Sequence, residues 1–301
     1  MIVNKKSLEA VTKTIKAVYL ATLLAKAQEQ MLYKKLAMII NSNSPEEVLS
    51  WIGDLPEVKE WLSERAKETL KYFDYTIKKK DWEATIKIMR DDILFDRLGV
   101  VKPRIMQLVE VGFAFYTKII IDLLKAGETT KCYDGKYLFA ANHDGVYNQA
   151  NIFNYKLTPK AYGLARANMR KLKTYSGQTI NINPTHLIVP PALETTGLEI
   201  IKSTTVSGST NIYQGTSELI VIPELTSDVE WYLADLSKGE LKPFIMQMVK
   251  PFENSFAALD DQTSEAAFMR KEYYYGIDSI MNAAPGFWQL IYKGKGTTDL
   301  S

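Results

Sequence analysis

The longest regular alternation of apolar and polar residues in this chain covers positions 103–126. Apolar side chains recur there every three or four positions, as on one face of a helix: Ile105, Leu108, Val109, Gly112, Phe115, Tyr116, Ile119 and Leu123. Pro103 suits a first helical turn, and Gly127 suits a left-handed stop. Glu110 and Asp122 argue against a membrane span, because each charge is costly in hydrocarbon. We predict a helix of roughly 36 Å with β-rich segments on both sides.

A second helical pattern covers the N-terminal segment, from Ser7 to about Ile40. Its apolar stripe has no obvious place to be buried within the segment itself. The segment therefore either lies on its own domain or forms an arm that reaches a neighbouring molecule, and the sequence leaves both open.

Between residues 46 and 92 the pattern becomes that of strands. Positions 73–77 and 82–88 alternate in polarity, and Lys78, Lys79 and Lys80 stand between them, which predicts a hairpin with a basic corner. Such a two-stranded projection carries too little apolar area to be stable alone. It needs another surface to lie on, often that of another subunit.

After the long helix, residues 136–227 mix short helices and strands. Thr158 and Pro159 are a good N-cap and first residue for a helix, which ends near residue 175. The pattern then predicts a strand at 179–189, a helix at 192–202 and a strand at 218–223. From residue 228 onward we expect almost only strands, at 229–234, 242–249, 268–281 and 286–292, with a polar loop at 251–265. The segments flanking 136–227 are expected to close into one β-rich layer on the long helix.

Composition adds few constraints. The 301 residues are 46% apolar and 24% charged, with a net charge of +2, so no strong field for nucleic acid or a membrane is expected. Cys132 is the single cysteine, which excludes an internal disulfide and fits a reducing cytoplasm. The start of the chain does not resemble a signal peptide. Since the only histidines are His143 and His186, a Cys/His zinc cage is excluded.

One cluster has the residue types of a catalytic site. His143 stands beside Asn142 and Asp144, nine residues after Asp134, and a histidine near carboxylates can act as a general base or bind a metal. No nucleophile motif accompanies it, and His-Asp pairs are common by chance. A structural turn is therefore favoured over a hydrolase that would use His143, Asp134 and Asp144.

The remaining candidate residues favour structural roles over catalytic or ligand-binding ones. The sequence contains neither a P-loop nor a G-x-G-x-x-G motif, and we expect no catalytic residue, no cofactor and no metal ion. Acidic residues at 91, 92 and 96 suit the capping of a segment better than a divalent ion, and those at 260 and 261 suit a solvated corner. The five tryptophans are spread along the chain and are typical of packing or interface anchors: Trp51, Trp61, Trp82, Trp231 and Trp288.

Several of these stretches together resemble the major head subunit of Mu-like bacteriophages and prophages. The matching stretches follow one another along nearly the whole chain: residues 51–61, 74–92, 124–135, 183–191 and 268–288. The segment 142–153 departs from the family, which often has proline after the histidine where this chain has Asp144, together with a Gly-rich insertion that is missing here.

The resemblance implies the α+β Hong-Kong-97-type capsid fold. In that fold the chain would divide into five parts: an N-terminal arm at 1–45, an extended hairpin loop at 46–92, a peripheral domain with a spine helix at 93–135, an axial domain at 136–227, and peripheral strands at 228–301. The hairpin would lie over an adjacent subunit, with Trp51, Trp61, Lys78, Lys79 and Lys80 as assembly contacts.

The resemblance also implies a structural function. The chain would assemble with copies of itself into pentamers and hexamers of an icosahedral shell around double-stranded DNA, in the cytoplasm of a bacterial host. Further partners would be scaffold, portal and decoration proteins, and no membrane is involved. A cellular nanocompartment shell of the encapsulin kind shares the fold and is the alternative.

Overall fold

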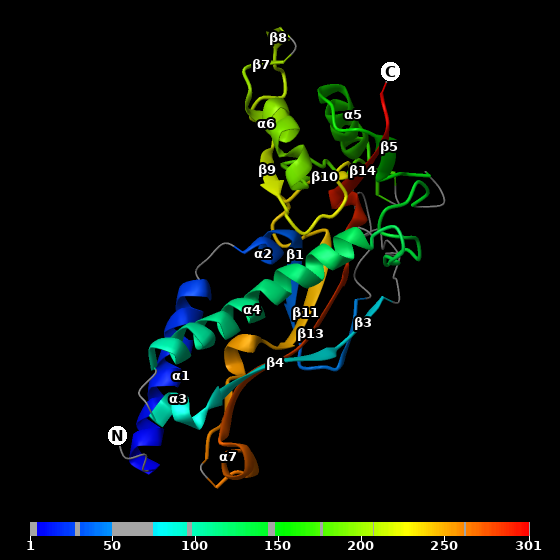
Figure 1. The fold of residues 1–301 in the computed structure, drawn as a ribbon. Coiled ribbons are helices and arrows are strands. Elements are labelled where there is room, and N and C mark those ends of the chain that lie inside the picture. The colour runs from blue at the N-terminus through cyan, green and yellow to red at the C-terminus, as the bar shows by residue number, and fades with distance from the viewer. Residues whose placement is uncertain are drawn as a thin grey trace.

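The computed structural model describes residues 5–27, 31–49, 75–94, 98–143, 148–174, 177–206, 208–261 and 263–300. The molecule is elongated, and the long helix α4 (Leu98–Lys125) crosses it diagonally between two groups of strands (Figure 1). In the described parts of the chain, no helix combines the length and apolar content that a membrane crossing requires.

Helix α4 confirms the predicted long helix, with two differences at its ends. It begins at Leu98, so Pro103 lies inside the helix and not in its first turn. Gly127 follows the helix but does not adopt a left-handed conformation. A glycine is required there because a Cβ atom would come within 2.4 Å of the buried ring of Phe139. Close packing, not turn geometry, selects this glycine.

One broad stripe of α4 is buried, as its periodicity predicts. The buried apolar residues are Val101, Ile105, Leu108, Val109, Phe113, Tyr116, Ile120, Ile121 and Leu124. Phe115, Ile119 and Leu123 are only partly buried at the margin of this stripe, so the centre of the buried face is rotated from the predicted one.

The lower sheet packs against α4. Its strands are β1 (Ala37–Asn41), β11 (Phe244–Lys250), β13 (Glu272–Pro285), β12 (Ala257–Leu259) and β4 (Lys80–Met89). Strand β13 is its axis: β4 pairs antiparallel along one edge, while β11 and β12 pair with the other. Residues of β13 alternate between buried and half-buried, the period-2 pattern of a sheet with one covered face.

The upper sheet contains strands from two distant parts of the chain. Its order is β5 (Ile152–Tyr155), β14 (Ile291–Thr298), β10 (Trp231–Ala234), β6 (His186–Val189) and β9 (Glu218–Val221). The prediction that the segments flanking 136–227 close into one layer is therefore wrong for β10 and β14, which pair with β6 and β5. All four residues of β10 are buried, so this strand needs cover on both faces.

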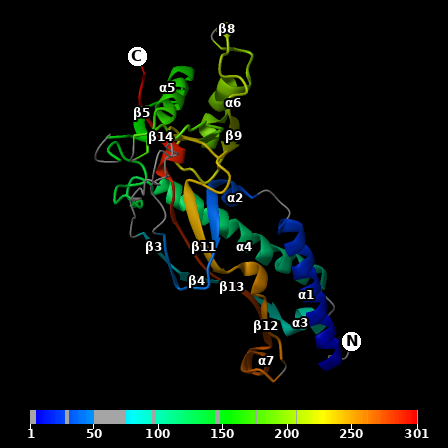
Figure 2. The ribbon, with the colours of Figure 1, turned by 180° about the vertical axis from the view of Figure 1, so that it is seen from behind.

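Helices and a small ribbon extend the upper part of the molecule (Figures 1 and 2). They are α5 (Pro159–Arg170), α6 (Glu194–Lys202), β7 (Thr205–Val206) and β8 (Ser209–Thr210). Helix α5 has the predicted start, because the Thr158 hydroxyl accepts a hydrogen bond from the Ala161 N–H at 3.1 Å. The strand predicted at 179–189 is confirmed only for β6.

The N-terminal segment is not one helix. Helix α1 (Lys5–Ala27) is followed by the short helix α2 (Leu32–Leu36), and residues 37–41 form β1, parallel to β11. Helix α1 lies beside α4, and the Tyr19 hydroxyl donates to the Phe252 carbonyl at 2.7 Å. The sequence left open whether this segment lies on its own domain or reaches a neighbour. In the structure, the face of α1 that carries Tyr19 packs on its own chain.

The predicted hairpin between residues 73–77 and 82–88 is wrong. Strand β3 (Thr76–Lys78) pairs with β2 (Glu46–Val48), whereas β4 pairs with β13. The chain therefore changes partner at Lys79, whose N–H donates to the Pro45 carbonyl at 2.9 Å. Alternation identified both strands, but it carries no information about which strand each one pairs with.

The region 251–270 contains short elements where a loop or a strand was expected. A one-turn helix (Phe252–Asn254) and β12 interrupt the predicted loop, and α7 (Glu265–Arg270) replaces the start of the strand predicted at 268–281. The Ser264 hydroxyl caps α7, and Lys271 ends it in the left-handed conformation. Two further one-turn helices (Pro191–Leu193, Trp288–Leu290) and α3 (Arg90–Leu94) complete the described elements.

We predict that Gly127→Ala lowers the free energy of unfolding by about 1–3 kcal/mol, because the added methyl group overpacks the site against Phe139. Urea unfolding followed by circular dichroism measures the change. Gly99→Ala, at the second residue of α4, is the control: nothing lies within 4 Å of a Cβ there, and alanine has a higher helix propensity than glycine. Equal stabilities of the two variants would contradict the packing argument.

Candidate assembly surfaces and buried polar centres

The predicted lysine contacts lie where the chain passes from one sheet to the other. Lys78 ends β3 and pairs with Glu46 at 3.2 Å, Lys79 pairs with Asp81 at 3.3 Å, and Lys80 opens β4. All three residues are exposed, although the side chain of Lys79 is only 37% accessible. Trp51 and Trp61 lie outside the described residues. The other three tryptophans are packing residues: Trp231 and Trp288 are fully buried, and Trp82 meets Phe115 edge to face, with ring centroids 4.7 Å apart.

His143 lies in a closed hydrogen-bonded cluster. Its Nδ1 lies 2.6 Å from Asp134, its Nε2 lies 3.1 Å from the Asn151 side-chain oxygen, and its ring stacks on Trp288 at 4.0 Å. Neither His143 nor Asp134 exposes more than 3% of its side chain. Asn151 donates in turn to the carbonyls of Leu138, Trp288 and Ile291.

This cluster joins the loop after α4 to the start of β14. A histidine without accessible surface has no room for a substrate, so the geometry favours the structural interpretation over the hydrolase. Asp144, the third residue of the hydrolase hypothesis, lies outside the described residues. Within the parts that the structure describes, no three His, Cys, Asp or Glu side chains gather as a metal site.

Cys132 is also buried, and burial raises the pKa of its thiol well above the usual value. Its Sγ lies 3.2 Å from the Gly286 carbonyl. A protonated, enclosed thiol is a packing group and not a nucleophile.

A buried lysine ties α4 to the upper sheet. Lys293 on β14 is 2% exposed, and its Nζ lies 2.8 Å from both Glu128, just after α4, and Glu230, just before β10. Lys295 adds a second contact to Glu128 at 2.7 Å. Although partial burial by itself raises the pKa of Glu128, hydrogen bonds from the two lysines hold that pKa below its ordinary value.

A second polar centre lies at the far end of β13. Glu272 accepts hydrogen bonds from Tyr274 at 2.6 Å, Lys87 at 3.0 Å and Arg270 at 3.1 Å. The hydroxyl of Tyr274, followed by the two cations, lowers the pKa of Glu272 to about 2. This carboxylate ties β4 and the end of α7 to the long strand.

A third centre anchors the arm. Tyr116 on α4 donates to Glu253 at 2.9 Å and accepts from the Phe252 N–H at 2.8 Å. Burial, then the charge of Glu253, raises the pKa of Tyr116. Since Tyr19 of α1 bonds the Phe252 carbonyl and its ring lies 4.6 Å from that of Phe256, one short turn holds both helices.

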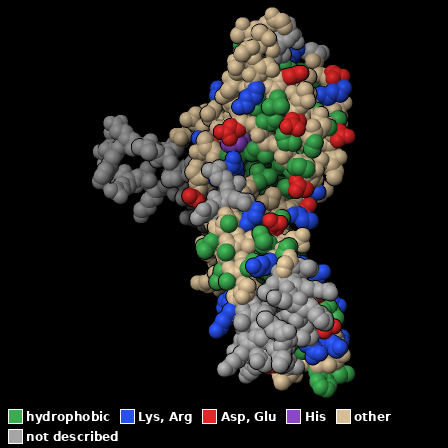
Figure 3. Space-filling model, turned by 60° about the vertical axis from the view of Figure 1, so that its left-hand side comes forward, with side chains coloured by type: hydrophobic (Ala, Val, Ile, Leu, Met, Phe, Trp, Pro, Cys, Tyr) green, Lys and Arg blue, Asp and Glu red, His purple; other side chains and the backbone are tan. Residues whose placement is uncertain are grey.

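The surface carries hydrophobic side chains that the chain itself does not cover. Phe268 and Met269 on α7 are 80% and 68% exposed. Figure 3 shows a group of hydrophobic side chains at the lower end of the molecule, where α7 lies, and others scattered among charges higher up. Ile212, beside the β7–β8 ribbon, is 77% exposed. These residues lie at the two extremities of the molecule.

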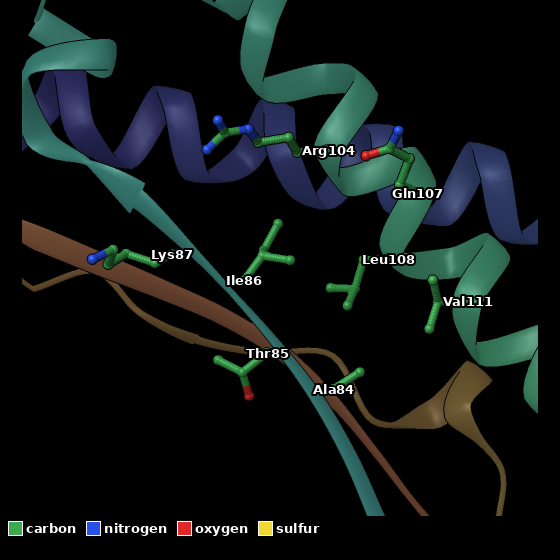
Figure 4. A pocket seen from close by; sticks show the side chains of 8 residues that line it. All are labelled: Ala84, Thr85, Ile86, Lys87, Arg104, Gln107, Leu108 and Val111. Carbon is green, nitrogen blue, oxygen red and sulfur yellow. The ribbon is translucent and has the colours of Figure 1, made fainter.

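An open groove of about 460 Å³ lies between β4 and α4 (Figure 4). Ala84, Ile86, Leu108 and Val111 make its apolar lining, and Arg104 and Gln107 project from the helix. Thr85 and Lys87 complete the lining, so the groove is open and mixed in polarity, which suits contact with another polypeptide better than enclosure of a small molecule.

The molecule therefore has exposed apolar side chains at its extremities, an open groove, and polar centres that tie its elements together. The family profile described as "Mu-like prophage major head subunit gpT" matches residues 8–155, 145–225 and 226–301. The chain belongs to this family. Among relatives of the Mu-like head subunit, the "Mu-like prophage FluMu major head subunit" of Haemophilus influenzae is 27% identical over 279 residues, covering 91% of this chain and 68% of that protein. The "Major capsid protein" of Escherichia phage Mu is 26% identical over 269 residues, covering 89% and 68%.

Solved structures place this Mu-like head subunit in the Hong-Kong-97-type fold. The procapsid of bacteriophage JBD30 matches with a TM-score of 0.62 and 24% identity, covering 99% of this chain and 77% of that chain. A virus-like particle from Pyrococcus furiosus matches with a TM-score of 0.52 and 10% identity, covering 94% and 98%. The predicted fold class, family and head-subunit function are confirmed.

Sequence reasoning did not find the Lys293 centre of this Mu-like head subunit. Lys293 directly follows the apolar residues Leu290, Ile291 and Tyr292, so a charge at the end of an apolar run was the available signal. Its partners, Glu128 and Glu230, are 165 and 63 positions away (293 − 128 and 293 − 230), and nothing in the sequence relates them.

We predict that Lys293→Met lowers the free energy of unfolding by about 3 kcal/mol, because Glu128 and Glu230 lose their shared counter-charge. Adding Glu230→Gln should restore part of the loss. Chemical denaturation measures both variants, and no recovery in the double variant would contradict the pairing.

For Glu272 we predict a pH-dependent contribution. Its folded pKa, about 2, lies below its ordinary value of 4.5, so its contribution is present above about pH 4.5 and is lost as the pH falls towards 2. Glu272→Gln should lower stability at pH 7 and flatten the dependence between pH 4.5 and 2. Glu199→Gln, on an exposed position of α6, is the control. Parallel stability profiles for wild type and Glu272→Gln would contradict the prediction.

Proposed function

We propose that copies of this chain assemble into pentamers and hexamers of an icosahedral shell that encloses double-stranded DNA. Membership of the Mu-like head-subunit family supports the proposal, because the matched profile covers nearly the whole chain. The elongated shape and the uncovered apolar side chains at both extremities are consistent with repeated contacts around a ring.

The physical basis of such a shell is contact area. Each subunit makes several modest contacts, and these add up because every further contact is made by a subunit that is already oriented. The net charge of +2 suits this arrangement, since like subunits must lie side by side. A catalytic centre is not needed, and we propose none.

The five-part division predicted from the family is retained as a proposal, with changed membership. The upper sheet with α5 and α6 is the proposed axial domain, and it includes β10 and β14. The lower sheet with α4 is the proposed peripheral domain, and it includes β1. The ribbon of β2 and β3 is the base of the proposed extended loop.

Assembly in the bacterial cytoplasm, and contacts with scaffold, portal and decoration proteins, are further parts of the proposal. A nanocompartment shell is the alternative, and the fold alone does not separate the two, since a virus-like particle shares it. The match to the head-subunit family favours the phage shell.

Electron microscopy of the purified chain, with analytical sedimentation, tests the proposal. Closed shells built of rings are the expected product, and they should package DNA in a phage lysate. A chain that stays monomeric at high concentration would refute the proposal. Small shells that carry a cargo enzyme and no DNA would instead support the nanocompartment.

We predict that replacing Lys78, Lys79 and Lys80 with glutamates lowers the yield of shells more than it lowers subunit stability. Exposed ion pairs such as Lys78–Glu46 contribute only about 0–1 kcal/mol each, so the urea midpoint of the subunit should change little. Particle yield by sedimentation is the measurement.

A control with the same charge change carries glutamates at Lys102, Lys118 and Lys136, all exposed. Normal particles from the 78–80 variant, or equal losses in both variants, would contradict a specific contact. Trp61→Ala should likewise lower shell stability and leave the circular dichroism of the subunit unchanged.

A further inference from the structure

Helix α1 is apolar on two opposite faces. Its inner face carries Ile15 and Tyr19, each 2% exposed, against the rest of the chain. Its outer face carries Leu20 and Leu24, which are 45% and 65% exposed, one turn apart. A helix on the surface of a globular protein normally has one apolar stripe and an opposite polar face. The second stripe of α1 therefore exposes apolar side chains to water, where a polar face is expected.

Small residues continue the outer stripe. Ala17 and Ala21 are exposed between and beside the two leucines, and short side chains allow the backbone of another helix to approach closely. Leucines four positions apart are neighbours on one helix face and form a pair of knobs. In Figures 1 and 2, α1 lies at the margin of the molecule with α4 on one side. The stripe is shaped for a helix.

The charge of α1 indicates which kind of helix could pack on this stripe. Within α1 the sequence contains five lysines (Lys5, Lys6, Lys13, Lys16 and Lys26) and one acidic residue (Glu9), so its net charge is 5 − 1 = +4. Lys16 and Lys13 are exposed about one and two turns before Leu20. Pairing α1 with α1 of a second copy would bring two groups of like charges together, which is unfavourable. An acidic partner helix would gain where α1 of a second copy would lose.

We propose that the outer face of α1 is a docking site for an acidic amphipathic helix of a second protein. The partner lays apolar side chains against Leu20 and Leu24 and places carboxylates beside Lys13 and Lys16. One such contact is small and weak, but a partner with several such helices, or a shell with many copies of α1, multiplies it. The inference goes beyond the proposed shell function and does not depend on it.

The test uses the purified full chain and two dye-labelled helical peptides of about 20 residues. Both peptides carry leucines at helical spacing on one face; one has glutamates and the other has lysines on the flanks. Fluorescence anisotropy should show that the acidic peptide binds at least about tenfold more tightly than the basic one, equivalent to about 1.4 kcal/mol.

Two variants of exposed residues locate the site. Leu20→Ser with Leu24→Ser should abolish binding of the acidic peptide, and Lys13→Glu with Lys16→Glu should reverse the preference between the peptides. Lys102→Glu with Lys136→Glu makes the same charge change elsewhere and should bind as wild type does. Circular dichroism and urea unfolding should show intact folds, because none of these side chains is buried.

Equal binding of the two peptides, or undiminished binding by the leucine variant, would overturn the proposal. So would a loss of self-assembly in the leucine variant, since a second copy would then be the occupant of the stripe. Capture of the wild type by phosphatidylserine vesicles, without binding of either peptide, would replace the partner helix with a membrane surface. The peptide measurement can be made on soluble subunits or on particles, so its failure is distinct from a failure to form shells.

Discussion

The stripe of apolar residues along α4 must be covered by parts of the chain that lie far away in the sequence. At 28 residues the helix is much longer than an average one, and its buried positions extend from Val101 to Leu124. Strands β4 and β13, the short helix α2 and the arm helix α1 all contact it. The elongated shape of the subunit follows, because each covering element lies along the rod instead of around a compact centre.

The polar centres hold these covering elements in place. Lys293 joins the end of α4 to two strands of the upper sheet, Glu272 joins β4 and α7 to β13, and the Phe252 turn joins α1 to α4. Each centre links segments more than a hundred residues apart. Because a buried charge is costly unless it is paired, the ammonium group of Lys293, which is 2% exposed, favours this one geometry over its alternatives.

A shell subunit needs internal contacts that hold its elements in place and exposed surfaces that can contact its neighbours. The molecule has such internal contacts and exposed apolar side chains at its ends. His143, which first suggests chemistry, and the single cysteine are enclosed, whereas Phe268, Met269, Ile212 and Leu24 are exposed. Exposed apolar side chains of this size are a liability in a molecule that stays alone. Their places, at the ends of the elongated subunit and along α1, are where contact with other chains is expected.

The sequence by itself determined the elements whose signal is local. The 3.6-residue period specified α4, Thr158 and Pro159 specified the start of α5, and ordered stretches along the chain specified the family. Only the tertiary structure decided which strands pair. Strand β3 pairs with β2 and not with β4, while strands β10 and β14 belong to the upper sheet. Gly127 leaves room for the ring of Phe139. The physical reason is that period and propensity are properties of a few neighbouring residues. Strand partners, buried ion pairs and close contacts depend instead on side chains that only the folded chain brings together.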